Sequence, residues 1–169
     1  PMIVGTNERK YAWMDEGFTT FINGLSTKAF NKGEFAQFSY FPGDITPFVF
    51  MEGMDALMTA PDVAQQGNLG IAAYEKPSIM LNALRDAVLG PERFDAAFKT
   101  YIERWAYKHP TPWDFFRTME NVAGEDLSWF WRAWVFNNWK LDVALGEVSY
   151  VDNDPKKGAD IIIQNKEQM

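Results

Sequence analysis

The sequence predicts a mainly α-helical fold that ends in a β-hairpin. Through most of the chain, apolar residues recur every three or four positions, which is the period of amphipathic helices. After Trp139 the pattern changes to apolar runs on either side of a polar turn, which indicates two strands. With 169 residues, 47% of them hydrophobic and 16% aromatic, the chain has enough apolar mass for one sizeable core. We therefore expect a helical part over residues 1–140 and a hairpin over residues 141–169 that starts a following β domain.

The first predicted helix starts at Asp15, which we expect to act as its N-cap. Its apolar face is formed by residues spaced at three and four positions, namely Phe18, Phe21, Ile22 and Leu25. Residues 32–50 are rich in Pro, Gly and Phe and predict an ordered loop. Residues 55–66 predict one or two short helices interrupted by a proline, and a glycine-bounded turn over residues 67–70 follows.

The strongest helical pattern begins near Met80 and is expected to stop at Gly90. Pro91 suits the first turn of the next helix, because an N–H at that position has no intrahelical partner. Thr111 is expected to cap a further helix, with Asp114 three residues later completing a capping box. A last helix opens after residue 126.

The tryptophans of the later helices admit two interpretations: they fill the core, or they form an aromatic platform for a sugar or a protein partner. Their helical spacing favours the core for the set Trp105, Trp113, Trp129, Trp131 and Trp134. Trp129 and Trp131 are two positions apart, so they cannot both face one side of a helix. We expect one of them to be exposed or to pack on a neighbouring domain.

Charge and composition exclude several classes of function. The chain carries 16 Lys and Arg against 23 Asp and Glu, a net charge of −7, so we expect no nucleic-acid partner. The absence of cysteine excludes thiolate catalysis and cysteine-bound metal sites. The one histidine, His109, is expected to lie on the surface at a helix end, and zinc usually takes more imidazoles than this. No apolar run is long enough to span a bilayer.

Two short segments interrupt the pattern of a plain helical domain. Residues 13–18 read WMDEGF and place an acidic pair at the start of an apolar helix. Acids favour helix N-termini because the macrodipole is positive there, so the pair has an ordinary structural explanation. Residues 74–77 read YEKP and place a tyrosine at the start of the longest helical region, where a half-buried tyrosine is common. Neither segment on its own indicates a catalytic or metal-binding site.

Together and in this order, the two segments resemble the gluzincin zinc aminopeptidases of the aminopeptidase N and leukotriene hydrolase type, peptidase family M1. Residues 13–18 match the family motif W-(L/M)-(N/D)-E-G-(F/H), so the resemblance implies that Glu16 is a zinc ligand. Residues 74–77 match Y-x-K-(G/P), so it implies that Tyr74 is the catalytic tyrosine that stabilises the transition state. The likeness continues to about residue 140 and implies the helical C-terminal half of a thermolysin-like catalytic domain. It also implies a peptide substrate.

The departures from the family are equally specific. Counting back from Glu16, the H-E-x-x-H helix that supplies two histidines and a general base would fall before Pro1. The G-A-M-E-N motif, which binds the free amino group of the substrate, is also missing. We therefore expect a piece of a longer polypeptide, inactive alone and dependent on its missing N-terminal part. The compartment is not fixed by the sequence, although the resemblance favours export from a bacterial cell.

Two alternatives to the peptidase remain open. One is a non-catalytic helical interaction module that kept the scaffold and lost the metal, and no residue after Pro1 separates it from the enzyme. The other is an epoxide hydrolase of the same family, whose pocket would lie outside this chain. Lys76, two residues after Tyr74, is expected to lower the pKa of the phenol if the two side chains lie close together.

Overall fold

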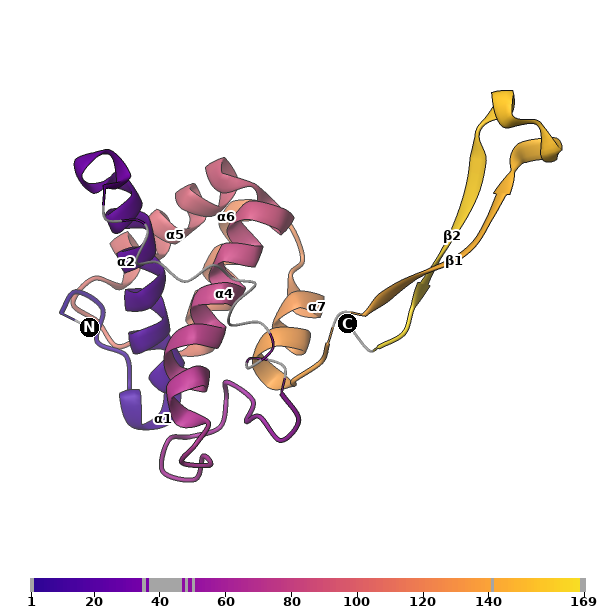
Figure 1. The fold of residues 1–169 in the computed structure, drawn as a ribbon. Coiled ribbons are helices and arrows are strands. Elements are labelled where there is room, and N and C mark those ends of the chain that lie inside the picture. The colour runs from indigo at the N-terminus through magenta and orange to yellow at the C-terminus, as the bar shows by residue number, and fades with distance from the viewer. Residues whose placement is uncertain are drawn as a thin grey trace. The chain divides into compact units, whose positions relative to one another are not determined.

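A computed structural model describes residues 2–34, 36, 47, 49, 51–140 and 142–167. The chain divides into two compact units, a helical unit over Pro1–Asn138 and a hairpin unit over Trp139–Met169 (Figure 1). The predicted class, mainly α with a C-terminal hairpin, is confirmed. That the two units belong to two domains of a larger protein stays a prediction. None of the helices in the described ranges is long and apolar enough to cross a membrane.

The first helical segment begins earlier than predicted. It runs through α1 (Glu8–Ala12), the π-helical turn η1 (Trp13–Gly17) and α2 (Phe18–Ala29), and the short 3₁₀ turn η2 (Phe30–Gly33) follows. The prediction of Asp15 as N-cap is therefore wrong, because Asp15 lies buried inside η1. Helical structure begins at Glu8, before Asp15, and the acid in its first turn is Glu8.

Residues 55–66 form turns, so the prediction of short helices there is wrong. The carboxylate of Asp55 accepts a hydrogen bond from the backbone N–H of Gln65 at 2.8 Å, and the Asn68 side chain donates to the Gly53 carbonyl at 2.9 Å. These side-chain bonds satisfy backbone groups that a helix would otherwise pair, as Asp and Asn commonly do in loops. The predicted loop over residues 32–50 lies largely outside the described residues.

The second helical segment runs through η4 (Ile71–Glu75), α4 (Lys76–Ala83) and η5 (Leu84–Leu89). It ends as predicted at Gly90, whose φ of 81° lies in the region that favours glycine. Pro91 then opens α5 (Pro91–Trp105).

The last helices follow the predicted caps. The capping box of Thr111 and Asp114 opens α6 (Pro112–Ala123), and α7 (Ser128–Trp131) continues into the π-helical turn η6 (Arg132–Phe136). Trp129 is 51% exposed whereas Trp131 is buried, which confirms that the two face different sides.

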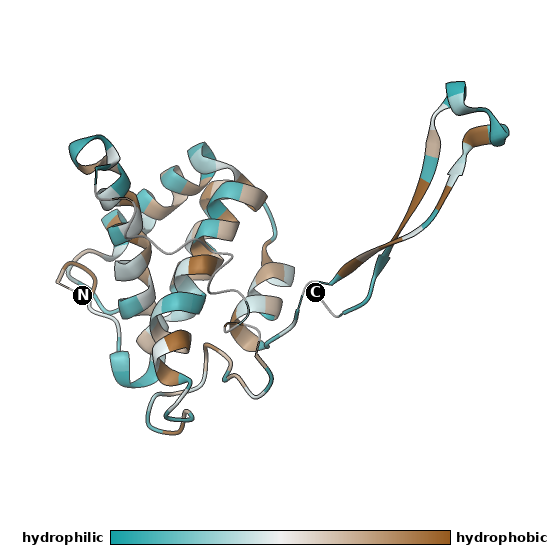
Figure 2. Ribbon diagram, viewed as in Figure 1, coloured by the Kyte–Doolittle hydropathy of each residue, from teal (hydrophilic) through white to brown (hydrophobic). Residues whose placement is uncertain are grey.

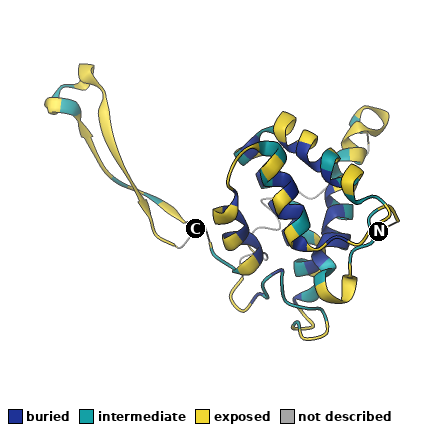
Figure 3. Cartoon of the chain, turned by 180° about the vertical axis from the view of Figure 1, so that it is seen from behind, coloured by how far each residue is buried: buried dark blue, intermediate teal, exposed yellow. Residues whose placement is uncertain are grey.

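The core of the helical unit is an aromatic cluster drawn from four helices, α2, α5, α6 and α7. Phe115 on α6 lies with its ring centroid 4.9 Å from that of Phe18 and 5.0 Å from that of Tyr101. Phe116 stacks on Trp131 at 4.6 Å. The buried faces of the helices turn toward one another, and the polar residues lie mainly on the outer faces (Figures 2 and 3). Phe18, the last residue of the segment 13–18, belongs to this cluster, and the segment that carries residues 74–77 packs against η1 and α2.

The hairpin pairs β1 (Val143–Tyr150) with β2 (Ala159–Asn165) in antiparallel register, with an irregularity between Leu145 and Val148. Two 3₁₀ turns, η7 (Val151–Asn153) and η8 (Pro155–Lys157), form its connection. Its apolar side chains are more than half exposed, among them Leu145, Ile161, Ile162 and Ile163. An isolated two-stranded hairpin is marginally stable in water.

Candidate metal and catalytic site

Glu16 and Tyr74, the two residues singled out in the sequence, meet in the structure. Glu16 lies in η1 and Tyr74 in η4, and these two π-helical turns pack against each other. The Tyr74 hydroxyl donates a hydrogen bond to the Glu16 carboxylate, and this bond is the main reason why the pKa of Tyr74 is raised above its ordinary value. Glu16 is half-buried and Tyr74 is 42% exposed, so both side chains are accessible to a ligand.

The local geometry around the pair is tight and irregular. Both residues stand in π-helical turns, which are rare and frequently occur at functional sites. Gly17 and Pro77, the neighbours of the pair in each motif, are in direct contact: a Cβ atom placed on Gly17 would lie 2.3 Å from Pro77 Cγ. The two motifs are therefore parts of one contact between helical segments.

Two further carboxylates surround the pair. Glu8 lies in α1 and Asp15 in η1, on either side of a kink at Tyr11, whose φ of −137° and ψ of 59° are not helical. The negative charge of Asp15 and a hydrogen bond between the two side chains raise the pKa of Glu8, and the charge of Glu16 adds to this. Sequence reasoning missed Glu8, because the kink at Tyr11 that lies between it and Asp15 has no helical periodicity to reveal it. The surface beside Glu16 is thus negative and suits a cation.

The condition for the expected effect of Lys76 on Tyr74 is not met, and the pKa of Tyr74 is raised. Lys76 is fully buried and donates to the Asn137 carbonyl at 3.5 Å and to the Asn138 side-chain oxygen. Residues two positions apart on a helix face different sides, so the ammonium group points away from the phenol. Burial lowers the pKa of Lys76 to about 8.

The chain supplies few metal ligands. Within the described ranges, no three side chains of the His, Cys, Asp or Glu type are arranged to hold a metal ion. His109 is exposed as predicted, and its Nδ1 atom lies 2.7 Å from the carbonyl oxygen of Gly5. Glu16 fits a zinc site as one carboxylate ligand, and further ligands have to come from outside the described residues.

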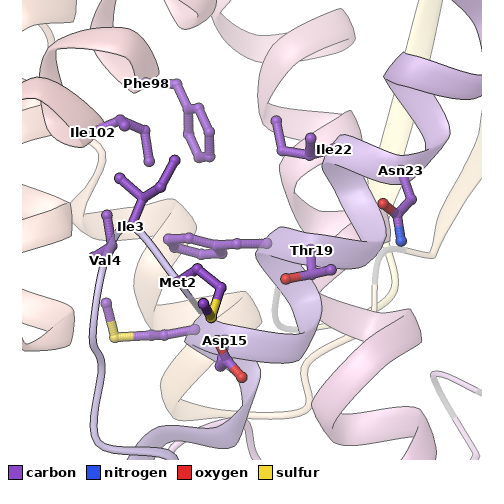
Figure 4. Close-up of a pocket in the computed structure, with 11 residues that line it drawn as sticks. Met2, Ile3, Val4, Asp15, Thr19, Ile22, Asn23, Phe98 and Ile102 are labelled. Carbon is purple, nitrogen blue, oxygen red and sulfur yellow. The ribbon is translucent and has the colours of Figure 1, made fainter. Parts of the chain in front are cut away.

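An apolar pocket of about 410 Å³ opens beside Asp15 (Figure 4). Ile22 lines it and is 43% exposed, so the expectation that Ile22 belongs to the buried face of its helix is wrong, whereas Phe18 and Phe21 are buried. The pocket joins the N-terminal segment, α2 and α5 through its lining residues Met2, Ile3, Val4, Met14, Asp15, Phe18, Thr19, Ile22, Asn23, Phe98 and Ile102. Exposed apolar surface of this kind is typical of a place where another segment or a ligand packs.

Comparison with known proteins identifies the family. Residues 3–134 match the model of the peptidase family M1 domain, which covers both motifs and the whole aromatic core. The chain belongs to peptidase family M1. Similar proteins include aminopeptidase M1-C of Oryza sativa subsp. japonica, 22% identical over 138 residues, and leucine aminopeptidase 2 of Eremothecium gossypii, 25% identical over 134 residues. Each comparison covers 73% of this chain but only 14% and 22%, respectively, of the relative. This M1 chain therefore spans about a fifth or less of the length of the relatives it matches.

Proposed function

We propose that this chain is part of a zinc-dependent aminopeptidase that hydrolyses the N-terminal peptide bond of peptide substrates. The observation that carries the proposal is the contact between Glu16 and Tyr74, which joins two distant motifs of an M1 chain in one accessible place. The names of the rice and Eremothecium gossypii relatives, which are aminopeptidases, support the same class of reaction.

Glu16 is proposed as one zinc ligand. A catalytic zinc typically has three protein ligands and one open position, and when bound it supplies a water that is activated at neutral pH. Two imidazoles from outside this chain would complete the set, as the family resemblance implies. The carboxylates of Glu8 and Asp15 support this role, because negative charge close to Glu16 favours a bound cation.

Tyr74 is proposed as the residue that stabilises the transition state. The phenol is protonated at neutral pH, because even the ordinary pKa of a tyrosine lies near 10, so the hydroxyl has a proton to donate. Before substrate binds, the Glu16 carboxylate accepts that hydrogen bond and holds the hydroxyl at the site. In the reaction the hydroxyl would donate instead to the oxyanion of the tetrahedral intermediate, a contribution of about 10²–10³ in kcat for a preorganised donor.

The chain by itself is expected to be inactive. One carboxylate cannot replace the missing imidazoles, so residues 1–169 alone should bind zinc weakly or not at all. The upstream part of the same polypeptide is therefore the partner that this site requires.

The proposal is tested on the full-length parent protein with aminoacyl-nitroanilide substrates and metal analysis. Glu16→Gln should lower the zinc content, because an amide oxygen carries no charge. Tyr74→Phe should retain zinc and lower kcat by about 10²–10³-fold with little change in KM. Tyr107→Phe and Glu92→Gln are matched controls, since both side chains are exposed and lie outside the two motifs.

Each outcome decides between the two candidate functions. Zinc loss in Glu16→Gln together with slow turnover in zinc-loaded Tyr74→Phe supports the peptidase and both residue roles. A wild-type parent that binds no zinc and cleaves no peptide refutes the enzyme and favours a helical interaction module.

A further inference from the structure

The approach of Tyr74 to Glu16 depends on how closely two helical segments pack. Gly17 directly follows Glu16, and Pro77 lies three residues after Tyr74, one helical turn along the same face. A Cβ atom at Gly17 would lie 2.3 Å from Pro77 Cγ and 2.5 Å from Pro77 Cβ. It would also lie 3.3 Å from the carbonyl oxygen of Ala73. Glycine is therefore the residue that fits at this contact.

The atoms nearest to a Cβ atom placed on Gly17 belong to residues before and after Tyr74 in the sequence. Ala73 precedes Tyr74, and Pro77 follows it in the first turn of α4. Ordinary van der Waals contact begins near 3.4 Å, so an alanine at position 17 would push the Pro77 ring away by about 1 Å. The proline ring is rigid and part of the helix, so the helical segment that carries Tyr74 would have to move with it.

We propose that Gly17 and Pro77 are positioning residues that set the distance between the Tyr74 hydroxyl and the Glu16 carboxylate. The inference rests on the proposed peptidase function. Neither residue touches the reacting atoms, since both act through the spacing of the two helical segments. A displacement of about 1 Å at a catalytic group can lower a rate about 100-fold, because the donor no longer meets the developing charge.

A double-mutant cycle on the full-length protein tests this contact. Gly17→Ala should lower kcat by about 100-fold, with KM and zinc content within about twofold of the wild type. Pro77→Gly removes both atoms that meet the new Cβ, so the loss caused by Gly17→Ala should shrink to less than tenfold when it is measured in the Pro77→Gly background. Pro77→Ala removes Cγ but keeps Cβ, so it should give an intermediate recovery.

Gly24→Ala is the matched control. Gly24 lies in α2, which follows directly after Gly17, and no atom would come within 4 Å of a Cβ placed there. This variant should keep the wild-type kcat, KM and zinc content. A second readout, independent of turnover, is the thermal midpoint of the metal-free protein. Gly17→Ala should lower this midpoint by about 5 °C, and Pro77→Gly should remove most of that difference.

The outcomes are separable from those of the proposed function. If the wild type is active and holds zinc, and Gly17→Ala lowers kcat equally with proline or glycine at position 77, the inference is overturned. The proposed function then still stands. Wild-type turnover in Gly17→Ala, or a failure to fold that Pro77→Gly does not repair, also overturns it. An inactive wild type refutes the proposed function, and the thermal cycle then still reports on the contact.

Discussion

Replacing Lys76 by methionine tests the electrostatic picture of the segment that carries Tyr74. Lys76 is fully buried, and its contacts with the Asn137 carbonyl and the Asn138 side-chain oxygen are with neutral groups. Burial lowers its pKa from 10.5 to about 8. Since one pKa unit corresponds to 1.36 kcal/mol, burying the charged form is disfavoured by about 3 kcal/mol.

The sign of the pH dependence follows from the direction of that change. Between pH 8 and pH 10.5 the unfolded chain holds a proton on Lys76 that the folded chain has lost. The free energy of unfolding therefore rises with pH across this window, and the full penalty applies below pH 8. In Lys76→Met this contribution disappears. The difference in unfolding free energy, wild type minus Lys76→Met, should increase by about 2–3 kcal/mol between pH 7 and pH 10.

The assay is urea unfolding followed by tryptophan fluorescence at several pH values, with Lys28→Met as the control. Lys28 is exposed near the end of α2, so its replacement should leave the pH dependence parallel to that of the wild type. If the unfolding free energies of the wild type and Lys76→Met change in parallel with pH, the reasoning is refuted. Such a result would mean that folding does not lower the pKa of Lys76.

Four further substitutions test the packing and one helix cap. Phe115→Ala removes the ring that joins α2, α5 and α6 and should lower the unfolding free energy by about 3–5 kcal/mol in urea titrations; a loss below about 1 kcal/mol would contradict the central place of this ring. Thr111→Ala breaks the capping box of α6 and should lower it by about 1 kcal/mol, whereas an unchanged urea midpoint would show that the cap is dispensable. Trp129→Ala removes a half-exposed ring and should change stability by less than Trp131→Ala in the same assay; equal losses would place both rings in the core.

The sequence predicted those parts of the fold that local chemistry decides. Gly90 followed by Pro91, and the pair Thr111 and Asp114, specify helix ends through backbone conformation and hydrogen bonds within one turn, so their prediction was confirmed. The predicted start of the first helix was wrong. Asp15 matches the N-cap pattern when only its neighbours in sequence are considered. Packing of Trp13 and Met14 into the core extends the helix beyond it.

The members of the candidate site could be proposed from the sequence, whereas their contact could not. The two motifs pointed to Glu16 and Tyr74, but their contact depends on the close approach of Gly17 and Pro77, which no periodicity reveals. The orientation of Lys76 was missed for a related reason, since its partners Asn137 and Asn138 come from a distant part of the chain. Such long-range contacts are decided by tertiary packing rather than by local sequence.

The most direct test of the central claim is the zinc content of the full-length parent protein and of its Glu16→Gln variant after identical purification. The proposed role of Glu16 predicts about one zinc ion per chain in the wild type, the number that three protein ligands would hold, and a marked loss of zinc in the variant. Equal zinc in both proteins would contradict the assignment of Glu16 as a metal ligand, and with it the role proposed for its contact with Tyr74.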